Sequence, residues 1–414
     1  MPRGKRSGLI SLLAVLLGLV TLVVPAAAAR SASVEATRAE LKVNGTRTSF
    51  VLDLSHGVRA EIFTLANPYR VIIDLPDVNF RLPKQAGQTG RGLVSAFRYG
   101  LLDEGKARIV LDTKKPVLIG NAGMAVRTGK AVRLTVELVG TTAKDFGAGT
   151  GGQRTAYAPL KSEPAEPYEE RSKKSKHRTK PIILIDPGHG GVDPGTISLS
   201  NHKEKSVVLA VGKKLRDKLA QTGRYDVHMT RTRDVFISLD ERLRMSRKLD
   251  ADLFISLHAD AIGQKNLADS VRGATVYTLS EKASDETARI MAEKENASDA
   301  IAGLQTTEID SQEEVRSILI DLLKRETANF SADLSNTLVK RLRKTISLSR
   351  TPQRSAAFKV LRQADTPSVL IELGYMSHKE DEKLLNSSAW QSSVAAALTS
   401  AIDSYFAKRT AKAR

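Results

Sequence analysis

Apolar and polar residues alternate along the first part of the chain. Between residues 34 and 140, short runs such as 108–112 and 132–136 repeat with a period of two. Turn signals such as Asn67-Pro68 and Leu82-Pro83-Lys84 separate these runs. A period of two is typical of strands with one buried face. Short strands at this spacing predict an all-β sandwich over 34–140.

The alternation is lost over residues 141–180. Residues 147–152 are rich in glycine, prolines follow at 159, 164 and 167, and residues 171–180 hold six cations and no acid. This composition predicts a flexible basic linker. Its basic half could contact an anionic surface or serve only as a solvated spacer.

From residue 181 the pattern changes to that of an α/β domain, which we expect over 181–409. The largely apolar runs 182–185, 253–257 and 369–371 alternate with amphipathic segments such as 206–219 and 390–406. Apolar runs of this length are typical of strands buried on both faces of a mainly parallel sheet flanked by helices. The predicted fold is therefore a multidomain one, with a β-sandwich followed by an α/β domain.

Each of these three apolar runs leads into a side chain suited to metal binding or acid-base chemistry. His189 follows the first run, His258 the second and Glu372 the third. Ligands in open α/β sheets bind at the carboxyl ends of the strands, so the three side chains are expected to share one rim. Glu204, at the start of the helix after the first strand, is a fourth candidate, although a carboxylate there could also serve only the helix dipole.

The chain has no cysteine, which excludes thiol nucleophiles, disulfides and cysteine-based zinc sites. It also lacks a Gly-x-Ser-x-Gly nucleophile elbow. Two histidines, one carboxylate and an open fourth position describe a catalytic zinc site, in which Glu372 could move the proton. Taken alone, His258 could be a core histidine, and His202 is a minor alternative ligand.

Two arginines of this region have open roles. Arg231 and Arg242 could contact substrate carboxylates or merely pair with Asp234 and Asp240.

Length and charge narrow the class of protein. The 414 residues suggest two or three domains, and 64 Lys+Arg against 46 Asp+Glu give a net charge of +18. This excess predicts an acidic partner, which could be nucleic acid, an anionic membrane surface or a cell-wall polymer.

The first 29 residues indicate the compartment. A basic start with Arg3, Lys5 and Arg6, an apolar run over 9–24 and small residues at 26–29 are typical of a cleaved secretory signal. The run is short for a membrane anchor. We therefore expect a protein that works outside the cytoplasm, with no nucleic-acid partner.

Five segments of the α/β region carry a family resemblance. They are IILIDPGHGGVDPG, the Glu of HKEKSVVLAVGKKL, TRTRDVFISLDER, LFISLHADA and SVLIELGYMSHKEDEKLL. In this order they resemble the motifs of zinc-dependent N-acetylmuramoyl-L-alanine amidases of the cell-division type. The resemblance implies one Zn²⁺ held by His189, Glu204 and His258, with Glu372 as the catalytic acid-base. The implied reaction is hydrolysis of the amide between N-acetylmuramic acid and L-alanine of peptidoglycan.

The β-rich region resembles the targeting domain of that family, called AMIN. The clearest parts are LANPYRVIIDLPDVNF at 65–80 and FRYGLLDEGKARIVLDTKKPV at 97–117. The resemblance implies a β-sandwich that binds peptidoglycan at the division septum. The same segments could also belong to a merely structural β-domain.

A long insertion separates two predicted strands, 273–279 and 358–361. Helices are expected over 281–296, 311–327 and 331–346, with an apolar stripe on the middle one. In the resembled amidases the corresponding region, which opens with a sequence like ENASD at 295–299, covers the zinc site until a LytM-type activator binds. The insertion at about 281–345 is thus a regulatory candidate, although an ordinary packed helix pair is the alternative. The candidates for blocking the metal are Glu308, Asp310, Glu313 and Glu314.

Together these observations predict a periplasmic zinc amidase that separates daughter cells and acts as a monomer, near the membrane only by proximity. Two other functions remain open at this stage. One is a zinc peptidase on stem peptides, and the other is a wall-binding protein without catalysis.

Overall fold

The computed structural model describes residues 33–127, 129–146, 178–261, 271–304, 318–363 and 365–412. Residues Val34–Arg414 form one compact unit. The expected secretion signal at 1–29 and most of the expected linker lie outside the described residues. Within the described part of the chain, no helix is both long and apolar enough to cross a membrane.

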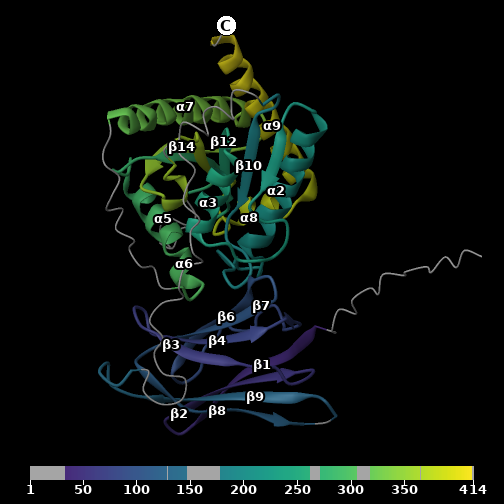
Figure 1. The fold of residues 1–414 in the computed structure, drawn as a ribbon, viewed down its shortest axis with the longest axis vertical. Helices are drawn as coiled ribbons and strands as arrows, with labels where there is room; N and C mark the ends of the chain where they lie inside the picture. Colours follow the sequence, from purple (N-terminus) through teal and green to yellow (C-terminus); the bar gives the residue numbers. More distant parts are fainter. Residues whose placement is uncertain are drawn as a thin grey trace, which may run out of the picture. The chain divides into compact units, whose positions relative to one another are not determined.

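The N-terminal region forms two mainly antiparallel sheets from nine strands, as the alternating pattern predicts (Figure 1). One sheet has the order β5-β1-β2-β9-β8 and the other β3-β4-β7-β6. Strands β1 and β5 pair in parallel, and all other pairs are antiparallel. The strand bounds are β1 Val34–Asn44, β2 Arg47–Leu54, β3 Glu61–Leu65, β4 Arg70–Pro76, β5 Val78–Phe80, β6 Val94–Asp103, β7 Lys106–Thr113, β8 Val117–Val126 and β9 Val132–Gly140.

One apolar core joins the inner faces of these two sheets. Phe50 of β2 meets Phe97 of β6 edge to face, with 5.2 Å between the ring centroids. Aromatic pairs of this geometry stabilise a core beyond their buried area. The chain after β9 stays packed here, because the Phe146 ring lies 4.7 Å from that of Tyr69. The start of the expected linker therefore belongs to the sandwich.

The C-terminal region is built on a six-stranded sheet of order β11-β10-β12-β15-β13-β14. Strands β11, β10, β12 and β15 are parallel, while β13 runs antiparallel to β15 and pairs in parallel with β14. The sheet is thus mixed, with a parallel part that holds all three predicted apolar strands. The bounds are β10 Ile182–Pro187, β11 Asp226–Met229, β12 Leu253–His258, β13 Ala274–Leu279, β14 Leu348–Ala356 and β15 Ser368–Glu372.

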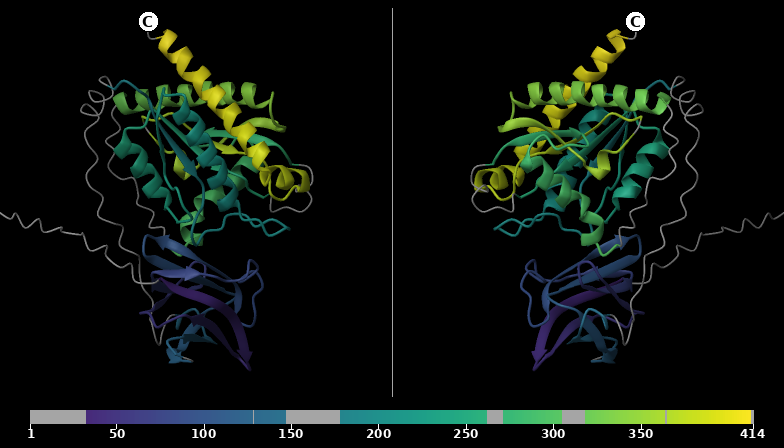
Figure 2. Two further views of the ribbon diagram at one scale, coloured as in Figure 1. Left: turned by 90° about the vertical axis from the view of Figure 1, so that its right-hand side faces the viewer. Right: turned by 90° about the vertical axis from the view of Figure 1, so that its left-hand side faces the viewer.

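Helices cover both faces of this sheet (Figures 1 and 2). Residues of α2 Glu204–Gln221, α7 Ile318–Leu342, α8 Lys379–Leu385 and α9 Ser388–Lys412 share one core with one face of the sheet. Residues of α3 Leu239–Leu249, α5 Glu286–Asn296 and the short 3₁₀-helix η1 Lys359–Leu361 pack on the other face. The α/β class expected from the sequence is confirmed, with strands buried on both sides.

The insertion differs from its prediction in two ways. A strand was expected over 358–361, but those residues lie in and beside η1, and the paired strand is β14. Strand β14 is polar and contains Pro352, which an edge strand tolerates because one side of its backbone has no partner strand. Apolar content alone therefore pointed to the wrong segment.

The second difference is that the helices expected over 311–327 and 331–346 join into the single helix α7. No glycine or proline interrupts residues 318–342, and the Ser331 hydroxyl donates to the Thr327 carbonyl inside the helix. Leu334, Leu338 and Leu342 are buried in the main core. This half of the insertion is therefore a structural layer of the domain.

Candidate active site

The loop after β10 holds His189 in an unusual backbone conformation. His189 has a φ of 56°, in the left-handed region, which a residue other than glycine rarely adopts. Arg242 donates to the His189 carbonyl at 2.9 Å, and Arg231 donates to the carbonyls of Pro187 and Gly188 at 2.9 and 2.8 Å. Two buried guanidinium groups thus stabilise the turn that presents the imidazole.

Both arginines therefore have structural partners other than those considered from the sequence. Arg242 pairs with the buried Asp186, which also accepts hydrogen bonds from the hydroxyls of Thr230 and Ser256 at 2.6 and 2.8 Å. Burial opposes the charge of Asp186, but Arg242 and these hydroxyls hold the pKa of its carboxyl below the ordinary value. This buried network connects β10, β12 and α3 beneath the site.

Glycine is required at one close approach in this loop. A Cβ atom on Gly188 would lie 2.4 Å from the His258 ring. The two imidazoles can therefore approach, with 4.9 Å between their centroids, only because Gly188 has no side chain.

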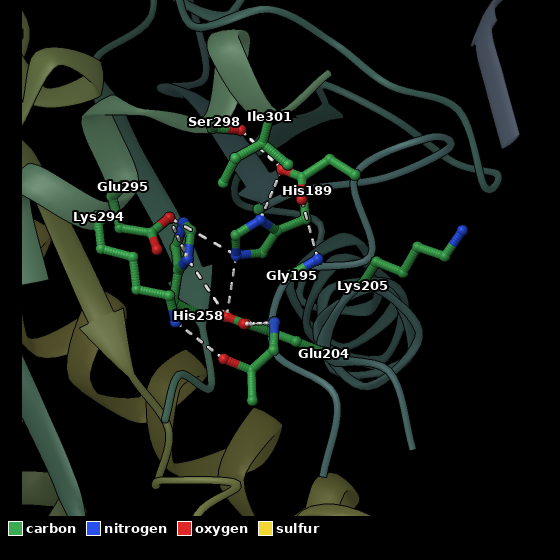
Figure 3. Close-up of polar contacts among 12 residues, drawn as sticks. His189, Gly195, Glu204, Lys205, His258, Lys294, Glu295, Ser298 and Ile301 are labelled. Carbon is green, nitrogen blue, oxygen red and sulfur yellow. Dashed lines mark hydrogen bonds and ion pairs between the residues drawn. The ribbon is translucent and has the colours of Figure 1, made fainter. Parts of the chain in front are cut away.

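The four residues expected at the rim come together (Figure 3 shows His189, Glu204 and His258). His258 and Glu372 end neighbouring parallel strands and are directly paired in register. The Glu204 Oε1 atom lies 3.2 Å from His189 Nε2 and 3.4 Å from His258 Nδ1. All four residues are buried.

The Glu204 carboxylate is fixed by backbone groups. Its Oε1 accepts a hydrogen bond from the Ala259 amide and its Oε2 one from the Thr196 amide, both at 2.8 Å. Burial opposes ionisation, yet the nearby His189 and His258 hold the pKa of Glu204 well below its ordinary value. Glu204 therefore presents a charged oxygen toward the two imidazoles rather than serving only as a helix-terminal charge.

Asp193 orients the His189 imidazole through the ring nitrogen Nδ1. Its Oδ2 atom lies 2.8 Å from His189 Nδ1, and its Oδ1 accepts a hydrogen bond from the Gly195 amide at 3.0 Å. Burial disfavours the charge of Asp193, but His189 lowers the pKa of this carboxyl to about 2. A carboxylate on the far nitrogen of a histidine fixes the ring with its other nitrogen free for a metal. Asp193 was not among the residues predicted from the sequence, although it lies four residues after His189.

A carboxylate that was not among the predicted site residues completes the cluster. Glu295, at the end of α5, places Oε2 3.1 Å from His258 Nδ1 and 3.6 Å from His189 Nε2 (Figure 3). Burial, more than any neighbouring charge, raises the pKa of Glu295 to about 7. The predicted blocking candidates Glu308, Asp310, Glu313 and Glu314 lie outside the described residues. Glu295 is the first residue of the ENASD sequence, and only that sequence pointed to it.

Lys294 and Ser298 hold the same segment against the domain. The Lys294 ammonium pairs with the buried Asp260 and donates to the Thr196 hydroxyl at 2.9 Å. The Ser298 hydroxyl donates to Asp193 Oδ2 at 2.7 Å. The segment around Glu295 therefore contacts groups next to both imidazoles.

Glu372 ends β15, next to the end of β12 that carries His258. Its Oε2 accepts a hydrogen bond from the Asp260 amide at 2.9 Å, and within the described structure its Oε1 has no hydrogen-bond partner. Burial, together with the charges of Asp260 and Glu204, raises the pKa of Glu372 well above its ordinary value. A carboxyl group with one fixed and one free oxygen is suited to accepting and returning a proton.

The cluster fits a zinc ion. Among the residues that the structure describes, neither His189 Nε2 nor His258 Nδ1 has a hydrogen-bond partner, although both atoms are buried. Buried polar atoms are nearly always paired, so two ring nitrogens without a hydrogen bond, beside carboxylates, are suited to hold a cation between them. Two imidazoles and carboxylate oxygens are typical ligands of catalytic zinc. His189 and His258 can form such a group with Glu295, and His189 can form another with Glu204 and Asp260.

His202 and His228 have partners outside this cluster. His202, the minor alternative ligand, is half exposed and its Nδ1 lies 3.1 Å from Glu382 Oε1. His228 pairs with Asp226.

Comparisons with known proteins show which families the chain resembles. A family model described as N-acetylmuramoyl-L-alanine amidase matches residues 183–404, and an AMIN domain model matches 39–122. The N-acetylmuramoyl-L-alanine amidase AmiC of Escherichia coli O6:H1 strain CFT073 is 30% identical over 376 residues, which is 89% of this chain and 88% of the relative. AmiC of Neisseria meningitidis serogroup B strain MC58 is 30% identical over 379 residues, which is 89% of each chain.

A solved amidase structure from Clostridium difficile 630 is 25% identical, covers 55% of this chain and 98% of its own, and has a TM-score of 0.39. The amidase match spans every residue of the histidine and glutamate cluster, and the AmiC relatives align along most of the chain. The chain therefore belongs to the N-acetylmuramoyl-L-alanine amidase family and carries an N-terminal AMIN domain.

Proposed function

We propose that this protein is a zinc-dependent amidase that hydrolyses the bond between the lactyl group of N-acetylmuramic acid and L-alanine in peptidoglycan. The observation that carries the proposal is the pair of buried ring nitrogens of His189 and His258 that face Glu204 and, among the described residues, have no hydrogen-bond partner. Glu372 stands in register beside His258. Family membership supports the choice of substrate bond.

In this proposal His189, Glu204 and His258 hold the zinc ion. When bound, zinc polarises the amide carbonyl and lowers the pKa of a water molecule toward 7. Asp193 keeps the His189 ring oriented, and the amides of Thr196 and Ala259 do the same for Glu204. These hydrogen-bond partners hold the metal-binding side chains of His189 and Glu204 in place before the zinc ion binds.

Glu372 moves the proton. Its bonded Oε2 keeps the carboxylate in place, while Oε1 is free to take a proton from the attacking water. The same oxygen then returns the proton to the nitrogen of L-alanine as the amide breaks. A positioned carboxyl group of this kind typically accelerates such a reaction by about 10²–10⁴.

The segment around Glu295 covers the site in the proposed resting state. The Glu295 carboxylate lies within 3.6 Å of both ring nitrogens that would bind the metal. The cavity at this point, lined by residues such as Gly188, His258 and Glu295, has a volume of about 10 Å³. That space admits about one water molecule and no part of a peptidoglycan strand. We therefore propose that the enzyme is autoinhibited, with Glu295 as the blocking group, until a LytM-type activator moves the insertion.

The proposed cellular role follows from the two domains. The AMIN domain would bind peptidoglycan and bring the amidase domain to the division septum, where cleavage separates daughter cells. Residues 1–29 would be removed on export to the periplasm, and residues between the domains would act as a basic tether. The protein would act as a monomer that is near the membrane only by proximity.

The test is digestion of purified sacculi by the full chain after zinc loading. Glu372→Gln should lose nearly all activity while binding the same amount of zinc, because it keeps the fold and the metal ligands. Glu380→Gln, on an exposed glutamate of the same domain, is the matched control and should stay active. Full activity of Glu372→Gln, or of the enzyme after exhaustive chelation, would contradict the proposed mechanism.

A further inference from the structure

The outer face of the β3-β4-β7-β6 sheet has an unusual composition. On β4 the outward positions alternate as Arg70, Ile72 and Asp74, and Ile72 is fully buried. Val110, on the neighbouring strand β7, is fully buried as well. The outer face of a two-layer sandwich is normally solvated, so buried apolar residues there indicate a packing partner.

The partner is the end of α6, Ser298–Ile301, together with the turn that follows it. Ala302 is fully buried and shares one apolar cluster with Ile72 and Val110. Gly303 approaches so closely that a Cβ atom on it would lie 2.7 Å from Ile72 Cδ1. The contact is therefore close-packed.

Three arginines of this sheet donate to the carbonyls at that helix end. Arg70 of β4 donates to the Ala300 carbonyl, and Arg98 of β6 donates to that of Ile301 at 3.2 Å. The buried Arg108 of β7 donates to the carbonyls of Ala302 and Gly303 at 3.3 and 2.9 Å. The last carbonyls of a helix lack partners within it and attract cations, so the three guanidinium groups form a cap.

Carboxylates fix the orientation of two of these arginine side chains. Asp112 holds Arg98 through two hydrogen bonds of 2.5 and 2.9 Å, and Asp74 holds Arg108 through two of 2.6 and 2.7 Å. A guanidinium group fixed in this way loses little further freedom when it binds the carbonyls.

The capped helix end is tied directly to Glu295. Ile301 lies six residues after Glu295 in the chain, and the hydroxyl of Ser298 between them donates to Asp193 (Figure 3). Asp299 accepts a hydrogen bond from the Leu239 amide at 2.9 Å. A displacement of α6 would therefore be transmitted to Glu295 through a short segment that includes the hydrogen-bonded Ser298 and Asp299.

The same sheet also touches the loop of the metal site. The Leu101 carbonyl of β6 accepts hydrogen bonds from the amides of Val192 and Phe236 at 3.3 and 3.2 Å. Val192 is three residues from His189. The AMIN domain thus contacts both the α6 segment and the loop that follows His189.

We propose that the AMIN domain is an intramolecular clamp, whose Arg70, Arg98 and Arg108 hold α6 and thereby keep Glu295 over the site. This inference rests on the proposed blocking role of Glu295. It gives the domain a regulatory function in addition to targeting, because any event that frees this sheet face also weakens autoinhibition.

The test compares basal sacculus hydrolysis by full-length variants. Arg98→Met should raise the basal rate by about fivefold and Arg70→Met combined with Arg98→Met by about 25-fold, since each removes one charged donor to α6 and independent losses multiply. Arg133→Met is the matched control: Arg133 has the same bidentate pairing, with Asp53, and similar exposure, but lies on β9 in the other sheet. It should leave the basal rate within about twofold, as expected for a surface ion pair.

A second variant attacks the contact from the other side. Ala302→Lys places a charge in the apolar contact without changing the AMIN domain and should also raise the basal rate. Hydrogen exchange should become faster over 291–304 in those variants that raise the basal rate. Combining any of them with Glu295→Ala should give a basal hydrolysis rate no higher than that of Glu295→Ala alone.

The outcomes separate the two proposals. If Glu295→Ala is activated but the Arg70, Arg98 and Ala302 variants stay at the wild-type rate, the clamp is wrong and the blocking role stands. If Glu295→Ala itself stays at the wild-type rate, the blocking role fails and the clamp fails with it.

Discussion

Replacing Glu295 by alanine is the most direct perturbation of the closed site. The substitution removes a carboxylate that lies 3.1 Å from His258 Nδ1 and 3.6 Å from His189 Nε2. The side chain is 6% exposed, so solvent screens these contacts little. Helix α5 itself should persist, because alanine is the best helix former and the Asp285 cap remains.

The expected magnitude follows from that contact. A desolvated charged contact contributes about 1.5–3 kcal/mol. If this free energy is lost from the closed state alone, the ratio of open to closed enzyme rises by about 10- to 150-fold. Basal hydrolysis should rise by the same factor until the open form predominates.

The assay is release of soluble fragments from labelled sacculi without any activator. Glu293→Ala is the matched control, because Glu293 lies on the same helix and is 63% exposed, paired only at the surface with Arg289. Zinc retention against a competing chelator provides a second readout, since loss of a carboxylate ligand should weaken zinc binding in the closed form.

Two results would refute this reasoning. One is a wild-type basal rate in a correctly folded Glu295→Ala variant. The other is an equal rise in Glu293→Ala, which would mean that helix stability matters and the carboxylate does not.

Three further predictions concern Asp193, Arg242 and Asp186, which hold the site residues in place. Asp193→Asn should weaken zinc binding by about 10–100-fold, measured by chelator competition, because it removes the carboxylate behind His189; unchanged affinity would count against this role. Arg242→Met should lower the free energy of unfolding by about 3–5 kcal/mol at pH 7 because Asp186 is left buried and unpaired, and adding Asp186→Asn should recover part of the loss in urea titrations; equal losses in both variants would argue against the pair. The wild-type contribution of Asp186 should be fully present above its ordinary pKa of 3.8 and lost as the pH falls through its lowered folded pKa, so Asp186→Asn should flatten acid unfolding, and an unchanged acid profile would contradict this.

The positions of His189, His258 and Glu372 could be predicted from the sequence because each follows an apolar run that marks a buried strand. The apolar runs before His189, His258 and Glu372 are buried on both faces, and the carboxyl ends of neighbouring parallel strands meet at one rim. The register that pairs His258 with Glu372 follows from that arrangement.

Other features depend on contacts that no local pattern encodes. Glu295 lies on an amphipathic helix among other acids, and only the fold shows that this one faces the histidines. The alternation of Arg70, Ile72 and Asp74 looks like an ordinary exposed strand face until its partner α6 is known. Helix α7 looked like two helices because the mainly polar residues 324–329 separate its apolar residues, whereas no glycine or proline interrupts the helix.

The central claim is cleavage of the amide between N-acetylmuramic acid and L-alanine, and product masses from digested sacculi test it most directly. The account predicts peptides that begin with a free L-alanine amine, together with glycan chains whose muramic acid carries a free lactyl carboxyl group. These products should appear faster with Glu295→Ala and be absent with Glu372→Gln. Peptides cut within the stem, or no products from a zinc-loaded Glu295→Ala enzyme, would contradict the account.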